Sequence, residues 1–263
     1  MADIFQTRAS MTLDSVVSLC RRPLTWLIVL FCLWWALLAV FYAFPQIDIW
    51  VSEQFFLKGA CLSESPLSGI CGSFPYAGEE LLIHVRRLYF YLPVAAAVLL
   101  ALAIVRNLQH HGATYNAKAT RQYWIALVSG ALGPYLLVNL ILKTISGRPR
   151  PYQTDFFGGA HQFTAAGTLD GSCLNNCSFI SGEAAGAGWM ACLIVLLPPR
   201  LRLFLGPPLI AFCLVSPFLR VGFGGHYLSD AVLGFLSSCV VYAAVTVYYG
   251  TQVEKNRWSK AGL

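Results

Sequence analysis

Residues 124–151 read WIALVSGALGPYLLVNLILKTISGRPRP, and this stretch decides the fold class. Residues 124–142 carry no charged side chain, which matches the length and composition of a helix that crosses a bilayer. Three cations follow closely, at Lys143, Arg148 and Arg150. The stretch therefore predicts a membrane helix that ends in a basic segment.

The composition extends this prediction to the whole chain. Of the 263 residues, 57% are hydrophobic and 11% are charged, whereas a soluble domain has about 25% charged residues. We expect an all-α, polytopic membrane protein that forms a single domain over residues 1–263. Six stretches are apolar enough to span, at residues 25–44, 83–105, 124–143, 182–197, 203–221 and 227–249.

The placement of Lys and Arg predicts the orientation. Eleven of the 18 basic residues flank alternate ends of these stretches, which assigns that side to the cytoplasm and places both termini there. No basic run exceeds a pair, so the net charge of +6 indicates membrane anchoring and does not indicate nucleic-acid binding. A signal peptide is the alternative for residues 25–44, but this stretch begins late and its apolar run is long.

Four of the nine cysteines lie in the expected outside loops, as Cys61 with Cys71 and Cys173 with Cys177. Paired cysteines on an oxidising face indicate disulfides. Zinc binding is the alternative, although the spacings are irregular and no His lies beside them. The first outside loop, residues 45–82, is long and aromatic and would be pinned by the first pair.

Three segments on the outside face carry groups suited to chemistry. The first is the basic segment at Lys143, Arg148 and Arg150, whose cations oppose the orientation rule and so indicate an anion site. The second is Ser181-Gly182-Glu183 at the start of a predicted helix, where Ser181 can act as N-cap and free backbone amides attract anions. A capped helix with an acidic first turn is the structural alternative for this second segment.

The third segment runs from Arg220 to Asp230. His226 and Asp230 are four residues apart, so we expect them on one helix face, with the carboxylate orienting the imidazole as a base or nucleophile. A His–Asp pair that holds two helices together is the structural alternative. Ionisable groups at the edge of a membrane helix are costly, which favours a functional role.

These segments resemble the signature of the type-2 phosphatidic-acid phosphatase family, K-x6-R-P, P-S-G-H and S-R-x5-H-x3-D. The first motif is complete in Lys143, Arg150 and Pro151. The third has Arg220, His226 and Asp230 at the family's spacing, with Leu219 in place of Ser. The second is partial, because residues 180–183 read Ile-Ser-Gly-Glu. The resemblance covers residues 124–249.

The resemblance implies the helical bundle shared with vanadium haloperoxidases, and no metal or other cofactor. It implies that His226 attacks phosphorus and that Asp230 orients it. Glu183 occupies the position of the family's general acid, and we expect it either to give the proton or to pair with Arg148. The residues that would bind phosphate are Lys143, Arg150, Ser181, Gly182 and Arg220, with Arg148 as an additional cation.

The implied function is a membrane lipid phosphatase that works at the periplasmic face of a bacterial inner membrane through a phosphohistidine. Lipid A is the substrate that the long outside loop and the Glu183 variant favour. Undecaprenyl diphosphate and phosphatidylglycerol phosphate are the alternatives. A protein that only binds or transports lipid phosphates is the alternative of another class. The expected partners are the lipid phosphate and membrane lipids, and no nucleic acid.

Overall fold

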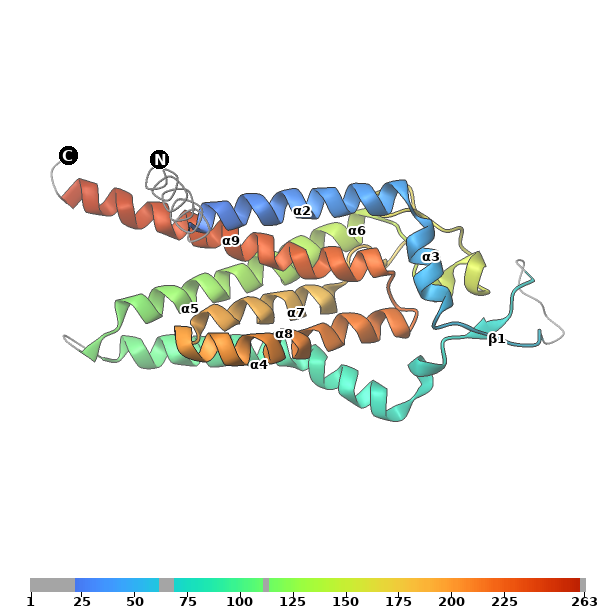
Figure 1. Ribbon diagram of the computed structural model, residues 1–263, viewed down its shortest axis with the longest axis horizontal. Helices are drawn as coiled ribbons and strands as arrows, with labels where there is room; N and C mark the ends of the chain where they lie inside the picture. Colours follow the sequence, from blue (N-terminus) through green and yellow to red (C-terminus); the bar gives the residue numbers. More distant parts are fainter. Residues whose placement is uncertain (1–21, 62–68, 111–113, 261–263) are drawn as a thin grey trace, which may run out of the picture.

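The computed structural model describes residues 22–61, 69–110 and 114–260, which fold into a bundle of long helices lying along one axis (Figure 1). Helix α5 (Ala117–Gly130) continues without a break into a π-helix, η3, and a last short turn, α6. The all-α prediction is confirmed. The helices of the bundle are α2 (Pro23–Ala43), α4 (Glu80–Leu108), α5 (Ala117–Gly130), η3 (Ala131–Leu142), α6 (Lys143–Ile145), α7 (Gly182–Cys192), η6 (Leu193–Leu196), α8 (Pro199–Gly222) and α9 (Leu228–Lys260).

Five segments of the described chain are long and apolar enough to cross a membrane, so the protein is a multi-pass membrane protein. The apolar helix at Gly182–Leu196 is shorter, and the predicted count of six spans stays a prediction. α2 and α4 expose Leu, Val, Phe and Trp or Tyr side chains along their lengths, as lipid-facing helices do. The five spans are Pro23–Ala43, Glu80–Leu108, Ala117–Ile145, Pro199–Gly222 and Leu228–Gln252.

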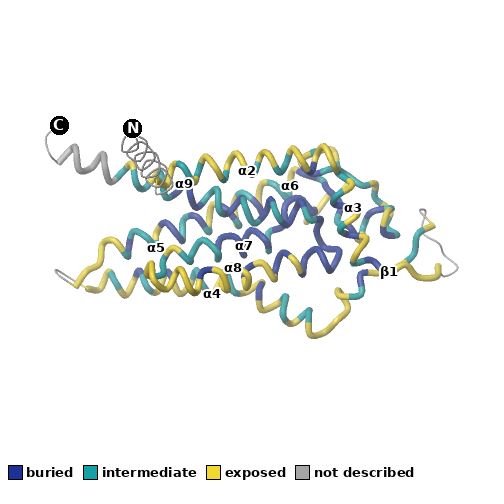
Figure 2. The backbone as a smooth tube through the Cα atoms, viewed as in Figure 1, coloured by how far each residue is buried: buried dark blue, intermediate teal, exposed yellow. Residues whose placement is uncertain are grey.

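The short helix α7 lies at the centre of the bundle, where Figure 2 shows most of its backbone as buried. It packs against α4, α5, η3, α8 and α9. Its Gly and Ala residues permit this close approach, since a Cβ on Gly188 would lie 2.2 Å from the carbonyl oxygen of Phe235 on α9. The second-motif residues begin this helix, so they are fixed by the most enclosed element of the fold.

The segments that carry the three motifs meet at one end of the bundle, which we call the motif end (Figure 1). The predicted first outside loop also lies there, and a disulfide joins Cys61 to Cys71 as expected. Phe56, Phe74, Phe157 and Tyr227 form a small buried cluster that packs this loop onto the bundle. The short elements at this end are α3 (Gln46–Glu53), β1 (Leu57–Lys58) paired antiparallel with β2 (Gly72–Ser73), η1 (Pro75–Gly78), η4 (Pro151–Gln153) and η5 (Asp155–Phe157).

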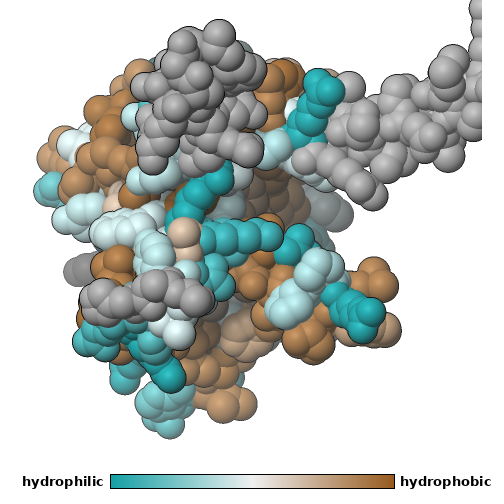
Figure 3. Space-filling model, turned by 90° about the vertical axis from the view of Figure 1, so that its left-hand side faces the viewer, coloured by the Kyte–Doolittle hydropathy of each residue, from teal (hydrophilic) through white to brown (hydrophobic). Residues whose placement is uncertain are grey.

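The opposite end of the bundle carries the connections from α4 to α5 and from η6 to α8, and α9 passes the start of α2 and continues beyond it (Figure 1). Figure 3 looks onto this end, where hydrophilic side chains gather between hydrophobic ones. Residues 1–21, which precede the first predicted span, lie outside the described residues. The connections therefore alternate between the two ends as the sequence predicts.

Candidate active site

A fully buried ionic network forms the floor of the motif end. The Arg148 guanidinium donates to Asp48 Oδ2 at 2.8 Å and to Asp230 Oδ1 at 2.6 Å. It also donates to the Ser229 hydroxyl and to the carbonyl oxygen of Thr164, each at 2.8 Å. The prediction that Arg148 binds phosphate is therefore corrected, because its side chain is 0% exposed and four of its five N–H donors already have partners.

The network holds one guanidinium between two carboxylates. Burial alone would lower the pKa of Arg148, but the nearby carboxylates of Asp230 and Asp48 outweigh it and raise the pKa. The guanidinium also lies 4.3 Å from the centre of the Tyr227 ring, within cation–π range. Arg148 thus stays charged and joins α3, the segment after α6, and α9.

His226 lies just before α9, which begins at Leu228. Its Nδ1 is 2.8 Å from the backbone oxygen of Ser178 and 3.9 Å from Asp230 Oδ2. The second distance is too long for a hydrogen bond, so the prediction that Asp230 orients the imidazole directly is corrected. Asp230 acts one step away, because its Oδ2 accepts hydrogen bonds from the Ser178 hydroxyl and the Tyr227 amide.

The contact with Ser178 defines the state of the imidazole. A carbonyl oxygen only accepts, so Nδ1 carries the proton and Nε2 keeps its lone pair. Burial lowers the pKa of His226 well below its usual value, and Arg220, Arg150 and Lys143 lower it further. His226 is therefore neutral near pH 7, as a nucleophile or base must be.

A cavity of about 780 Å³ opens beside this imidazole. Its walls include His226 and four cations, Arg86, Lys143, Arg150 and Arg220. Arg220 is 5% exposed, yet its side chain makes no hydrogen bond to any described residue. Its Nε lies 3.4 Å from the Glu183 carboxylate, and a buried guanidinium that makes no hydrogen bond suits an anion that arrives from outside.

Glu183 lies among these cations. Its carboxylate accepts from Arg86 NH2 at 2.6 Å and from Arg86 Nε at 3.2 Å, and it lies 3.4 Å from Arg220 Nε. The alternative in which Glu183 pairs with Arg148 is thus corrected, since Arg148 is held by the buried network. Arg86 takes that place, and the paired side chains of Arg86 and Glu183 are 38% and 11% exposed.

The start of α7 forms one wall of the cavity. The Ser181 hydroxyl accepts from the amide of Ala184 at 3.3 Å, which confirms the predicted N-cap. A Cβ on Gly182 would lie 2.4 Å from Oδ1 of Asn139, so any larger residue would require the Asn139 side chain to move. Gly182 and Glu183 both line the cavity, whereas Ser181 is fully buried behind them.

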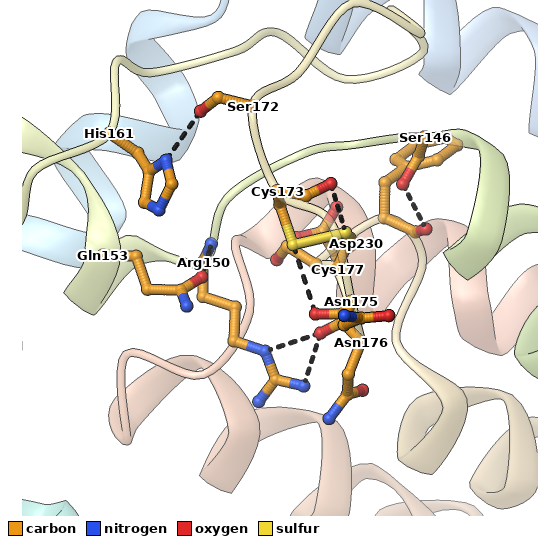
Figure 4. The surroundings of a disulfide bond; sticks show 12 residues. Ser146, Arg150, Gln153, His161, Ser172, Cys173, Asn175, Asn176, Cys177 and Asp230 are labelled. Carbon is orange, nitrogen blue, oxygen red and sulfur yellow. Dashed lines mark hydrogen bonds between the residues drawn. A yellow bond between two sulfur atoms is a disulfide. The ribbon is translucent and has the colours of Figure 1, made fainter.

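A short segment, Cys173–Ser178, crosses the motif end, and we call it the strap. Figure 4 shows Arg150 reaching the strap, where its Nε and NH2 donate to the carbonyl oxygen of Asn176 at 3.2 and 3.0 Å. A disulfide between Cys173 and Cys177 closes the strap on itself. The strap therefore contacts both Arg150 and, through Ser178, His226.

Residues 122–254 match the family model described as the PAP2 superfamily. The chain belongs to the PAP2 superfamily. It is 49% identical over 228 residues to a lipid A 4'-phosphatase of Rhizobium etli, covering 86% of this chain and 89% of the relative. It is also 49% identical over 216 residues to a lipid A 4'-phosphatase of Rhizobium leguminosarum, covering 82% and 93%.

A solved structure has a similar fold. The first transmembrane PAP2-type phosphatidylglycerolphosphate phosphatase from Bacillus subtilis matches with a TM-score of 0.50 and 16% identity. The match covers 86% of this chain and 96% of that structure. The superfamily match and the two 49% identical relatives show that this PAP2 chain is a membrane lipid phosphatase, a phosphoric monoester hydrolase.

Sequence reasoning missed three residues of this PAP2 site: Asp48, Arg86 and Ser178. Asp48 could have been detected from the sequence, because it is an acidic residue in a strongly apolar segment, IDIWV. Arg86 stood out only as a cation against the orientation rule. Ser178 acts through its backbone oxygen, which no side-chain pattern reveals.

The four loop cysteines form the two disulfides, which removes the zinc alternative for them. No cluster of three or more His, Cys, Asp or Glu side chains that could hold a metal occurs in the described part of the chain.

Proposed function

We propose that this PAP2 enzyme is a lipid A 4'-phosphatase that acts at the periplasmic face of the bacterial inner membrane. One observation carries the proposal: the lone-pair nitrogen of His226 and the buried guanidinium of Arg220, which makes no hydrogen bond with a described residue, line the same cavity. The names of the 49% identical relatives supply the substrate. Both termini then lie in the cytoplasm, and the motif end faces the periplasm.

The rest of the cavity suits a lipid tail. Below the cations, its walls come from α4, α5, η3 and α7 and are mostly apolar, with Phe90, Val94, Leu127 and Trp189 among them. A phosphate at the cations and an acyl chain in this apolar part would occupy one continuous space. Because α4 and η3 also expose hydrophobic side chains on their outer faces, a lipid can reach the cavity from the bilayer.

The phosphate is bound by side chains that have no stronger partner. Lys143 makes no hydrogen bond or ion pair with a described residue, and Arg150 bonds only a backbone oxygen. Together with Arg220 and the amides at Gly182, they place positive charge around the three non-bridging oxygens. Stabilising charge on these oxygens is the main task in phosphoryl transfer. Arg148 and Asp230 support the site from below and do not touch the phosphate.

The chemistry proceeds in two steps. Nε2 of His226 attacks phosphorus, the bond from phosphorus to the sugar oxygen breaks, and the sugar oxygen takes a proton. Water then attacks the phosphohistidine, the P–N bond breaks, and inorganic phosphate leaves with the imidazole restored. Ser178 holds the Nδ1 proton in both steps, so the same nitrogen is always presented to phosphorus.

Glu183 moves the protons. In the resting enzyme it forms ion pairs with Arg86 and Arg220. A phosphate monoester has a second pKa of about 6, so a substrate that arrives as the monoanion brings one proton. Glu183 passes this proton to the leaving oxygen, later takes one from the attacking water, and returns that proton to the departing phosphate. Among the described residues that line the cavity it is the sole carboxyl group.

Purified enzyme in detergent micelles tests the proposal with lipid A as substrate. We expect release of one phosphate, a product of higher mobility on thin-layer chromatography, and an acid-labile phosphoenzyme. His226→Ala should abolish both the phosphate release and the phosphoenzyme. His84→Ala is the matched control because His84 is exposed on α4. Lipid A that stays unhydrolysed while phosphatidic acid or an isoprenyl diphosphate is cleaved would refute the substrate. Binding without any phosphate release would favour a lipid-phosphate carrier.

A further inference from the structure

A second, smaller pocket lies beside the phosphate site, between the strap and the end of η3 and α6. Its volume is about 300 Å³. It shares Asn139, Lys143 and Asn176 with the main cavity, so a group bound at Lys143 is next to both spaces. The remaining walls are Thr144, Leu174 and Asn175.

The polar groups of this pocket are not used by the fold. The side chains of Asn175 and Asn176 make no hydrogen bond to any described residue, and Figure 4 shows both extending from the strap. Asn139 donates from Nδ2 to Pro134, and Thr144 donates to Leu140, so each keeps an oxygen free to accept. The pocket therefore offers amide donors and several acceptors, which match a molecule with neighbouring hydroxyl groups.

The backbone conformation of the strap explains why Asn is present at only one of these two positions. Asn176 has φ +51°, a left-handed conformation that Asn tolerates well. Asn175 has no such backbone requirement and caps no helix. The strap is braced by the Cys173–Cys177 disulfide and anchored by the Cys173 amide, which donates to Gly147 at 2.8 Å. A braced segment that presents unused amides is suited to recognition, because little side-chain and backbone order is lost on binding.

We propose that this pocket binds the sugar ring that carries the scissile phosphate and so selects phosphorylated sugars over glycerol phosphates. The inference rests on the proposed function, because a lipid A 4'-phosphate is attached directly to a glucosamine ring. With the phosphate at Lys143, the ring lies within reach of the strap amides, whereas a glycerol headgroup presents fewer hydroxyls to them.

The test compares two monoester substrates in the same micelles, lipid A and phosphatidic acid, and measures the ratio of their kcat/KM values. Asn175→Ala removes one amide, and Asn176→Gly removes the other while keeping the left-handed backbone and its carbonyl contact with Arg150. We expect each variant to lower the ratio by roughly 3- to 10-fold, the usual effect of one lost hydrogen bond. Ser172→Ala is the matched control, since Ser172 bonds His161 and lies outside the pocket.

The possible outcomes separate the two proposals. A parent enzyme that hydrolyses phosphatidic acid but not lipid A overturns the proposed substrate, and the sugar pocket with it. A parent that hydrolyses lipid A, together with strap variants whose ratio stays within twofold of the parent, overturns the sugar pocket alone. A ratio that falls equally in Ser172→Ala also overturns it, since the effect would then be a general loss of loop structure.

Discussion

Replacing Glu183 with Gln separates proton transfer from ion pairing at the active site. The amide keeps the size and shape of the carboxyl group but has no charge and cannot relay a proton. In the resting enzyme the substitution removes the ion pair with Arg86 and the 3.4 Å contact with Arg220 Nε. If Glu183 moves protons in both steps, kcat should fall sharply while KM changes little.

The expected magnitudes of the two effects differ enough to be measured. General acid–base catalysis contributes about 10²- to 10⁴-fold in rate, or roughly 3 to 5 kcal/mol of barrier. The ion pair contributes less, because the Arg86 side chain is 38% exposed and solvent screens it. A pair of this kind is worth at most about 1 kcal/mol, or about fivefold. A loss of kcat above about 100-fold therefore cannot come from the ion pair with Arg86.

Two comparisons sharpen the assay. Arg86→Gln removes the same ion pair and leaves the carboxyl group, so its kcat should stay within about tenfold of the parent. An aryl phosphate needs no proton on its leaving oxygen, so Glu183→Gln should be much less impaired with it than with lipid A. If Glu183→Gln keeps near-normal kcat on lipid A, or loses equally on both substrates, the relay is refuted and Glu183 only positions the arginines.

Four further predictions follow from the same geometry. Reporter fusions after His110 and Gly167 should read cytoplasmic and periplasmic respectively, and the reverse pattern would contradict the orientation. Orthovanadate should inhibit turnover and a chelator should not, because side-chain cations and amides hold the phosphate; zinc- or magnesium-dependent recovery would argue against this. The pKa of His226 is lowered by burial and by nearby cations, so the imidazole is protonated only at more acidic pH. The fall in kcat/KM on the acidic side should therefore have its midpoint below pH 6.5. A midpoint above pH 6.5 would contradict a neutral imidazole. Asp48→Asn should cost roughly 3 to 5 kcal/mol of stability, seen as a lower thermal midpoint, because one partner of a buried ion pair is lost, whereas the exposed Glu53→Gln should change little.

Hydropathy alone predicted the spanning helices well, because a helix that crosses a bilayer needs about 20 mostly apolar residues in a row. It was least informative for α7, whose Gly and Ala residues make it short and weakly hydrophobic. The reason is its central position, because α7 packs against protein and not against lipid. At Gly188, for example, the backbone of Phe235 leaves no space for a side chain.

The site was predictable where a side chain works through local spacing. Four predicted residues meet at one cavity because each lies at, or within a few residues of, the motif end of a membrane helix: Lys143, Arg150, Arg220 and His226. Arg148 was misassigned because its carboxylate partners, Asp48 and Asp230, are 100 and 82 residues away in sequence. Spacing shows that a cation is present and gives no information on which distant carboxylate neutralises it.

The contact between Arg148 and Asp48 has a consequence for how this enzyme can be divided or recombined. The segment that matches the superfamily model begins at residue 122, whereas Asp48 lies on α3, far upstream of it. A chimera that grafts residues 122–254 onto another scaffold would thus bring the arginine without its second carboxylate. A working chimera must therefore include Asp48 and helix α3, or use a recipient that supplies an acidic side chain at the same place.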